Sequence, residues 1–296
     1  MAKTRFRSDS GLTARMGLVT FLLGALYVAF GAFLVTQTGF AFGLIIVFGL
    51  AWGQWYFSDK IALASMRARL VTPEQAPELH GMIDRLCALA DMPKPRVAIA
   101  DTDLPNAFAT GRTPKKAVVC VTTGIMHRLD AEELEGVLSH ELAHVANRDV
   151  AIMTVASTLG LLAGFITRWG LYFGGGRRDS NGGPAIIVIW IASIAVYAIS
   201  FVLTRALSRY RELSADRSGA YLTGKPSALA SALVKISGEM GRIPTKDLRQ
   251  AESMNAFFFT PAINRDSLSA LIATHPSTEK RLEQLSKVAA DLGRPL

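Results

Sequence analysis

Apolar residues in this chain gather in long uninterrupted runs. Residues 16–58 contain no Asp, Glu, Lys or Arg over 43 positions. Within that stretch, residues 16–35 and 40–57 form runs of 20 and 18 residues, each long enough to cross roughly 30 Å of hydrocarbon as a helix. Two later uncharged runs follow, with 18 residues at 150–167 and 23 residues at 182–204. The pattern predicts four transmembrane helices.

The remaining segments have the periodicity of a soluble domain. They predict, in chain order, a helix over 74–90, strands over 96–100, 106–110 and 117–122, a helix beginning near Asp130, a polar helix over 205–224, and helices over 227–238 and 282–292. Residues 174–183 and 241–265 predict loops. Asp130, with Glu133 three residues later, has the spacing of a capping box. The prediction is a mainly helical domain with a small sheet, divided in the sequence by the third and fourth apolar runs.

Composition and charge exclude several classes of protein. Half of the residues are hydrophobic and only 19% are charged, which excludes a disordered chain. Two cysteines, Cys87 and Cys120, cannot build the disulfide framework of a small secreted fold. The net charge is +8, but no basic run is interleaved with aromatic residues, so no nucleic-acid partner is predicted. The basic excess is better explained by charge that flanks membrane helices.

The basic flanks predict how the helices are oriented, because short cytoplasmic segments are enriched in Lys and Arg. The first run is preceded by Lys3, Arg5, Arg7 and Arg15, and the second is followed by Lys60, Arg67 and Arg69. The turn at 36–39 has no basic residue, so the N-terminus and residues 58–149 are expected in the cytoplasm. Arg168, Arg177 and Arg178 lie between the third and fourth runs, which makes the third span the weakest. A cleaved signal peptide is the alternative for the first run, but its apolar core would be too long.

A metal-binding motif lies in the capped helix. His140 and His144 are four residues apart, so both imidazoles lie on one helical face and can reach one ion. Glu141, beside the first histidine, can reach a water on that ion and act as general base. A catalytic zinc site normally has three protein ligands, so one ligand is missing.

The third ligand is expected on another element. The remaining histidines are His80, His127 and His275, and a carboxylate is the alternative to them. Glu212 is the best carboxylate, because it lies on the helix that leaves the fourth run, at nearly the same height above the bilayer as His144. Asp216, one turn later, can accept the second N–H of one histidine and fix its orientation. The alternative for both acids is a solvated face balanced by Arg209, Arg211 and Arg217.

Four features together resemble the HtpX family of bacterial membrane zinc endopeptidases, relatives of the CAAX prenyl proteases. They are the histidine motif at 140–144 followed by an apolar run, the Glu212 and Asp216 pair after the next run, Asn-Ala-Phe-Ala-Thr-Gly at 106–111, and Thr-His-Pro-Ser-Thr-Glu-Lys-Arg-Leu at 274–282. The resemblance implies ATP-independent, zinc-dependent cleavage of membrane or misfolded proteins at the cytoplasmic face of the cell inner membrane. It also implies a part in the stress response and protein quality control.

The resemblance assigns roles to two further segments. Asn106, Ala107 and Phe108 resemble the family's edge strand beside the zinc helix, which would take up substrate backbone as an added strand. His275 resembles the family's C-terminal histidine, which could donate a hydrogen bond to the developing oxyanion. Arg281 is expected to brace an acidic group nearby.

The fold class expected is a mostly α integral membrane protein, with four transmembrane helices and a cytoplasmic, zincin-like α+β catalytic domain carrying a small sheet. Its segments are a basic N-terminus at 1–15, two membrane helices at 16–57, the first part of the catalytic domain with the zinc helix at 58–149, two membrane helices at 150–204, and the second part with the third ligand at 205–296. One Zn²⁺ per chain would be held by His140, His144 and Glu212. The partners expected are protein substrates and the lipid bilayer, and the pattern favours no particular oligomeric state.

Two other functions would fit part of the pattern. A prenyl-type protease that processes C-terminal peptides is disfavoured, because four spans are fewer than such enzymes have. A membrane transporter or scaffold with a structural zinc is the non-enzymatic alternative. It is disfavoured because a structural site is closed by four protein ligands and no fourth ligand is evident.

Overall fold

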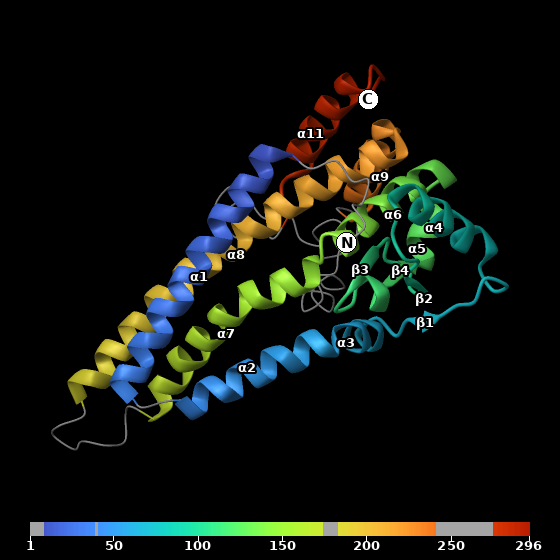
Figure 1. The fold of residues 1–296 in the computed structure, drawn as a ribbon. Coiled ribbons are helices and arrows are strands. Elements are labelled where there is room, and N and C mark those ends of the chain that lie inside the picture. The colour runs from blue at the N-terminus through green and yellow to red at the C-terminus, as the bar shows by residue number, and fades with distance from the viewer. Residues whose placement is uncertain (1–8, 39–40, 174–182, 241–274) are drawn as a thin grey trace.

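The computed structural model describes residues 9–38, 41–173, 183–240 and 275–296, and it is mostly helical (Figure 1). Four helices form an elongated bundle: α1 (Ser10–Thr38), α2 (Ala41–Tyr56), α7 (Asp149–Phe173) and α8 (Gly183–Thr223). The strands and the shorter helices gather at one end of this bundle. The loop predicted at 241–265, and residues 174–182 of the other predicted loop, lie outside the described residues.

Three of the described helices are long and apolar enough to cross a membrane, over Ser10–Leu34, Asp149–Thr167 and Ile187–Thr223. Large apolar side chains such as Phe21, at 71% exposed, and Val28, at 74% exposed, point away from the bundle, as expected for contact with lipid. The second predicted span corresponds to α2, whose 16 residues cover only about 24 Å. Three of the four predicted spans are therefore confirmed as candidates, and the crossing by α2 stays a prediction.

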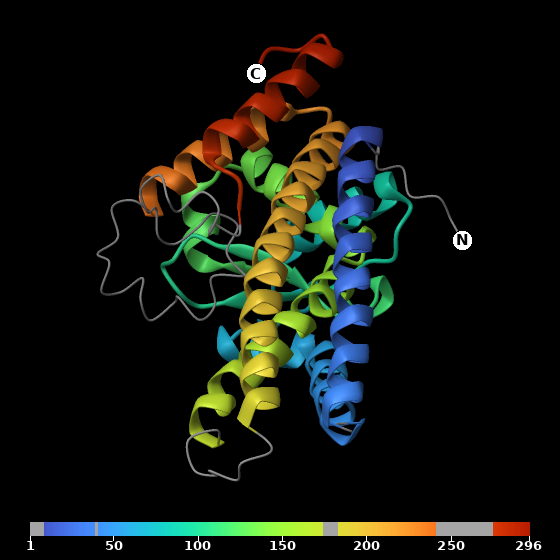
Figure 2. The same cartoon turned by 90° about the vertical axis from the view of Figure 1, so that its left-hand side faces the viewer.

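Helix α8 links the membrane part to the rest of the molecule. It contains 41 residues in one continuous helix, about 60 Å long, so the fourth apolar run and the polar helix predicted after it are one element. It packs against α7, and α1 runs along its length (Figure 2). Residues near the end of α8 are thus held at a defined height relative to the membrane helices.

The sheet is small and mixed, with the strand order β1-β2-β4-β3. Strands β2 (Arg96–Ala100) and β4 (Val118–Thr122) are parallel, whereas β1 (Arg69–Leu70) pairs antiparallel with β2 and β3 (Ala107–Thr110) antiparallel with β4. All three predicted strands are present within one residue of their expected bounds. Within the described part of the chain, β3 is the last strand on its side of the sheet.

Helices cover both faces of this sheet and bury it. On one face the core includes α4 (Pro77–Ala90), α6 (Ala131–Ala146), α9 (Pro226–Met240) and α11 (Thr278–Asp291). On the other face, α3 (Ser58–Ser65) packs through Ala62 onto a cluster that includes Phe108 and Cys120. Neither α3 nor α5 (Thr123–Arg128) was predicted, since each is too short to show a helical period.

The start of α6 is anchored by Glu133. The predicted capping box is present, with Asp130 accepting from the Glu133 N–H and Glu133 accepting from the Asp130 N–H. The Glu133 carboxylate also accepts from the Ser231 hydroxyl at 2.6 Å and from Lys235 at 2.7 Å, both on α9. Burial by itself would raise the pKa of Glu133, but these hydrogen bonds lower it below its usual range. This one side chain therefore joins the beginning of α6 to α9.

Replacement of Glu133 by alanine is expected to lower the free energy of unfolding by about 1–2 kcal/mol at pH 7, because the capping box and the links to α9 are lost. Since the folded-state pKa is lowered, this stabilisation is present above the unfolded value of roughly 4.3 and disappears as the pH falls through the folded value. Unfolding in detergent at pH 7 and at lower pH measures both effects. The control is Glu132→Ala, whose ion pair with Lys225 is exposed and should contribute under about 0.5 kcal/mol. If the loss of unfolding free energy in Glu133→Ala becomes larger as the pH falls, the proposed role of the ionised Glu133 carboxylate is contradicted.

Candidate metal centre

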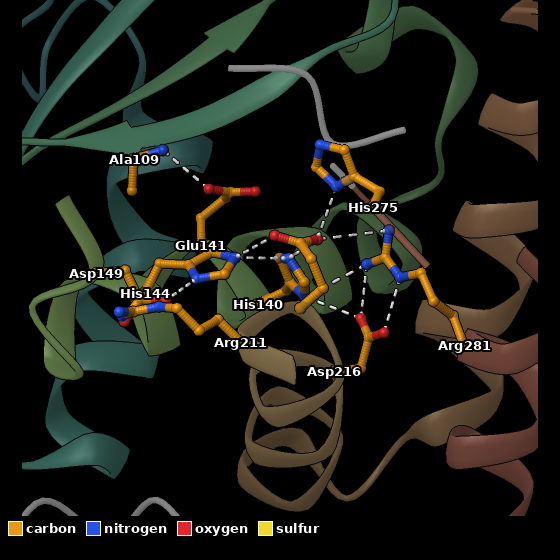
Figure 3. Close-up of polar contacts among 10 residues, drawn as sticks. Ala109, His140, Glu141, His144, Asp149, Arg211, Asp216, His275 and Arg281 are labelled. Atoms are coloured by element: carbon orange, nitrogen blue, oxygen red, sulfur yellow. Dashed lines mark hydrogen bonds and ion pairs between the residues drawn. The ribbon is translucent and has the colours of Figure 1, made fainter. Parts of the chain in front are cut away.

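Helices α6 and α8 approach each other closely because α8 has a glycine at the contact. A Cβ atom added at Gly219 would lie 2.8 Å from Ser139 Oγ and 2.9 Å from the His140 backbone nitrogen. Any larger residue would therefore push the helices apart. The contact brings the face of α8 that carries Glu212 and Asp216 against the face of α6 that carries the two histidines (Figure 3).

Three side chains form a compact cluster of possible metal ligands: His140, His144 and Glu212. The Nε2 atoms of the two histidines are 3.0 Å apart. Glu212 Oε1 is 3.4 Å from His144 Nε2, and Glu212 Oε2 is 3.6 Å from His140 Nε2. His140 and Glu212 are buried, at 1% and 7% exposed.

This cluster fits a zinc ion. Tetrahedral zinc with bonds of 2.0–2.2 Å to nitrogen and oxygen places its ligand atoms about 3.3 Å apart, close to the three separations observed. Glu212 Oε2 is buried and makes no hydrogen bond of good geometry within the described residues, although His275 Nδ1 lies 3.0 Å away. Two imidazoles and one carboxylate are also a donor set typical of catalytic zinc.

Both histidines are backed by a carboxylate on their second ring nitrogen. Asp216 Oδ1 lies 2.9 Å from His140 Nδ1, and Asp149 Oδ2 lies 2.5 Å from His144 Nδ1. Burial lowers the pKa of each histidine, but the carboxylates around the rings raise both values above the usual range. Arg281 donates to both Asp216 oxygens, at 2.6 and 2.7 Å, and so braces it as expected.

The alternative of a solvated face for the two acids of α8 is wrong. Glu212 is 7% exposed, Asp216 is fully buried, and Arg211, expected to be a solvated counter-charge, is 5% exposed. These groups face the interior because α8 is enclosed by α6 and α11 at this level.

Glu141 lies between the histidine cluster and the sheet. Its side chain is buried, and burial raises the pKa of its carboxyl group. Its Oε2 accepts a hydrogen bond of 2.8 Å from the backbone N–H of Ala109 on β3 (Figure 3). A buried carboxyl of raised pKa beside the ligand cluster has the properties of a general base.

Of the predicted substrate residues, Ala107 and Phe108 lie on β3, beside α6, and Asn106 directly precedes the strand. The Ala109 N–H points away from β4 toward Glu141, so by strand alternation the backbone groups of Ala107 face the same way. The side chains of Asn106 and Phe108 are buried, and Phe108 packs on the α3 side of the sheet. Substrate contacts in this region would therefore be made by backbone groups.

His275 lies at the opposite side of the cluster from Ala109 (Figure 3). Its Nδ1 is 3.0 Å from Glu212 Oε2, and the side chain is 7% exposed. The two other histidines are elsewhere. His80 Nε2 contacts the Val71 carbonyl oxygen at 3.1 Å, and His127 is exposed on α5.

Asp149 was not predicted as part of the site, because in the sequence it is only the last residue of the segment 58–149 that carries the zinc helix. Helix α6 instead ends at Ala146, and Arg148 adopts a left-handed conformation with φ of 57° before α7 begins at Asp149. This turn directs the carboxylate back toward His144. The available signal was an acid five residues after His144, a histidine of the candidate ligand cluster.

Comparisons with known proteins show what the chain is similar to. The profile of peptidase family M48 matches residues 73–289. Protease HtpX homolog 1 of Streptomyces coelicolor is 56% identical over 295 residues, covering 98% of this chain and 97% of that protein. Protease HtpX homolog of Moorella thermoacetica is 55% identical over 294 residues, covering 96% and 97%.

Among solved structures, S. mikatae Ste24p has a similar fold. The TM-score is 0.52 at 19% sequence identity, over 91% of this chain and 62% of that one. At this identity the similarity concerns the fold alone. The chain spans less than two thirds of the length of Ste24p.

Proposed function

The chain belongs to peptidase family M48, and we propose that it holds one zinc ion between His140, His144 and Glu212. It is a membrane metalloprotease of the HtpX type, so its reaction is the hydrolysis of peptide bonds. The observation that carries the proposal is the buried ligand cluster, whose atoms are separated as zinc ligands require. When bound, zinc supplies a Lewis acid that activates water and polarises the scissile carbonyl.

The protein's own groups carry the proton transfers. Glu141 accepts a proton from the attacking water and then donates it to the leaving amine. Its position beside the ligand cluster and its raised pKa support this role. His275 donates a hydrogen bond to the oxyanion that develops on the carbonyl oxygen. Asp216 accepts from His140 Nδ1 and so keeps Nε2 of that ring directed at the metal.

Substrate backbone pairs with β3 as an added strand. The outward-facing backbone groups of Ala107 and Ala109 are the partners, and main-chain pairing of this kind accepts many sequences. Extended segments of membrane or misfolded proteins suit such a site, which supports a role in protein quality control under stress. The Ala109 N–H that now donates to Glu141 would be available to substrate when Glu141 turns to the water.

Removal of the metal is expected to abolish proteolysis. Digestion of casein, an unfolded protein, by the purified full chain in detergent should stop on treatment with a chelator and return on addition of Zn²⁺. Magnesium addition is the control, since its octahedral oxygen preference does not match two imidazoles. Casein digestion that persists in the metal-free protein, or cleavage confined to prenylated C-terminal peptides, would contradict the proposed function.

For the membrane arrangement we propose that all four helices cross the bacterial inner membrane, with the catalytic domain in the cytoplasm. His144 precedes α7 and Glu212 lies near the end of α8, and the two residues meet at one site. If α7 and α8 both cross the membrane, in opposite directions, the chain returns to the side from which it left, so His144 and Glu212 lie on the same side. The basic residues before the first run and after the second support the cytoplasmic side.

Single cysteines tested with a membrane-impermeant maleimide on intact cells should report this topology. Cysteines at Thr38 and Asp179 should be labelled from outside, and cysteines at Arg69 and Lys287 only after lysis. If Thr38 is labelled from outside but Asp179 is not, α7 and α8 do not cross the membrane and instead form a hairpin on the cytoplasmic side. The metal site would remain possible in that arrangement. A label at only one of Arg69 and Lys287 would contradict a single catalytic domain.

The native cysteines provide the internal control for this labelling. Burial raises the pKa of Cys87 to about 11 and that of Cys120 to about 12. Because the thiolate is the reactive form, neither should react at pH 7 in the folded protein. Both should react after unfolding in denaturant.

A further inference from the structure

We propose that Asp149 and Arg211 act as a positioning pair for the ligand His144, and that they make the zinc site depend on the packing of α7 against α8. The inference rests on the proposed function, because it assumes that His144 is a zinc ligand. It concerns two residues that the reasoning from sequence left outside the site.

The contacts place Asp149 between a ligand and a cation. One carboxylate oxygen, Oδ2, is 2.5 Å from His144 Nδ1, and the other, Oδ1, forms an ion pair with the Arg211 guanidinium (Figure 3). Asp149 is 8% exposed and Arg211 is 5% exposed. Arg211, Asp149 and the His144 ring therefore form a connected chain of contacts that leads to the ligand cluster.

The arrangement decides which nitrogen of His144 is available to the metal. With the Nδ1 proton donated to Asp149, the lone pair of Nε2 points at His140 and Glu212. Without that acceptor the ring can rotate or carry its proton on Nε2, and either change weakens coordination. The ion pair to Arg211 in turn fixes the rotamer of Asp149, so it acts on His144 indirectly.

The two histidine ligands are supported in the same way from different parts of the protein. His140 is held by Asp216 of α8, which Arg281 of α11 braces. His144 is held by the first residue of α7 and by a residue of α8 that precedes Glu212. Since α7 and α8 are both candidate membrane spans, a shift of α7 against α8 would break the Asp149–Arg211 pair behind His144 but leave the Asp216–Arg281 pair behind His140.

A simpler role for Asp149 is to favour the start of α7, where an acidic residue interacts well with the helix dipole. That role needs neither the contact with His144 nor burial against Arg211, and it makes a different prediction. Loss of the dipole interaction would affect stability and leave zinc affinity unchanged.

The test measures zinc affinity by competition with a chelator, in the full chain in detergent and in a Glu141→Gln background that prevents self-digestion. Asp149→Asn, which keeps the shape and removes the charge, should weaken zinc binding by about 10- to 100-fold. Arg211→Met should weaken it less, and Arg211→Lys should restore most of the loss. Asp59→Asn is the matched control, because it breaks another Asp–Arg pair, with Arg96, on the far side of the sheet.

Two further measurements separate positioning from general stability. The zinc-free Asp149→Asn protein should unfold within a few degrees of its zinc-free parent. In the active background at saturating zinc, kcat for casein should fall while KM stays within about twofold, since Asp149 does not contact substrate.

The outcomes distinguish this inference from the proposed function. The positioning role is overturned if Asp149→Asn binds zinc within twofold of the parent's affinity. It is also overturned if this isosteric variant fails to fold without zinc. Neither result argues against the zinc site itself. If the parent protein binds no zinc, the proposed function is overturned and the inference with it.

Discussion

Replacing Glu141 with glutamine should abolish proteolysis while leaving the zinc content unchanged. The amide keeps the size of the carboxyl group, and its oxygen can still accept from the Ala109 N–H, so the fold around β3 is preserved. It cannot accept a proton from the attacking water. Loss of a general base should lower kcat by about 100- to 10,000-fold with little change in KM. The rate of casein digestion and the zinc per chain, measured on the same preparation, test both parts.

A second glutamate of α6 provides the matched control. Glu135 is also buried, but it pairs with Arg85 at 2.7 Å, and its carboxylate takes no part in the ligand cluster. Glu135→Gln should therefore keep its activity. Undiminished digestion by Glu141→Gln would remove Glu141 from catalysis, and loss of zinc from that variant would identify it as a ligand instead.

Replacing Glu212 with glutamine should remove both zinc and activity. Glu212 supplies the only negative charge among the three proposed ligands, and an amide is a much poorer ligand for zinc than a carboxylate. Two neutral imidazoles alone should not retain the ion through purification, so zinc per chain should fall close to zero. Casein digestion should fall below detection in the same preparation.

The paired results for Glu141→Gln and Glu212→Gln distinguish catalysis from metal binding, because only the second variant should lose its metal. Glu283→Gln is a suitable control, since Glu283 is exposed on α11 and contacts Lys287 one turn away. Glu212→Gln protein with the zinc content of the parent would exclude Glu212 as a ligand. His275, the remaining nearby histidine, would then be the candidate.

Much of the fold could be predicted because its strongest signals are local. The capping box of Asp130 and Glu133 marks the start of α6, and uninterrupted apolar runs mark α1, α7 and α8. The range of β4 follows from the β-branched residues of the run at 117–122. The elements that were missed, such as β1 with two residues and α3 with eight, are fixed by packing onto the rest of the domain rather than by their own periodicity.

The candidate site could be predicted where spacing within one helix determines geometry. His140 and His144 share a face because they are four residues apart, and the same holds for Glu212 and Asp216. Asp149 and Arg211 could not be predicted, because their contact depends on a left-handed turn at Arg148 and on how two membrane helices pack. A charged residue next to an apolar run is usually solvated, and only the enclosure of α8 shows that Arg211 is not.

The central claim is that one zinc ion is bound by His140, His144 and Glu212. The most direct test is anomalous X-ray diffraction at the zinc absorption edge from crystals of the inactive Glu141→Gln protein. The account predicts a single strong peak, about 2.0–2.2 Å from Nε2 of both histidines and from a Glu212 carboxylate oxygen. A zinc peak bound by other residues, or zinc-loaded crystals with no peak between these three side chains, would contradict it.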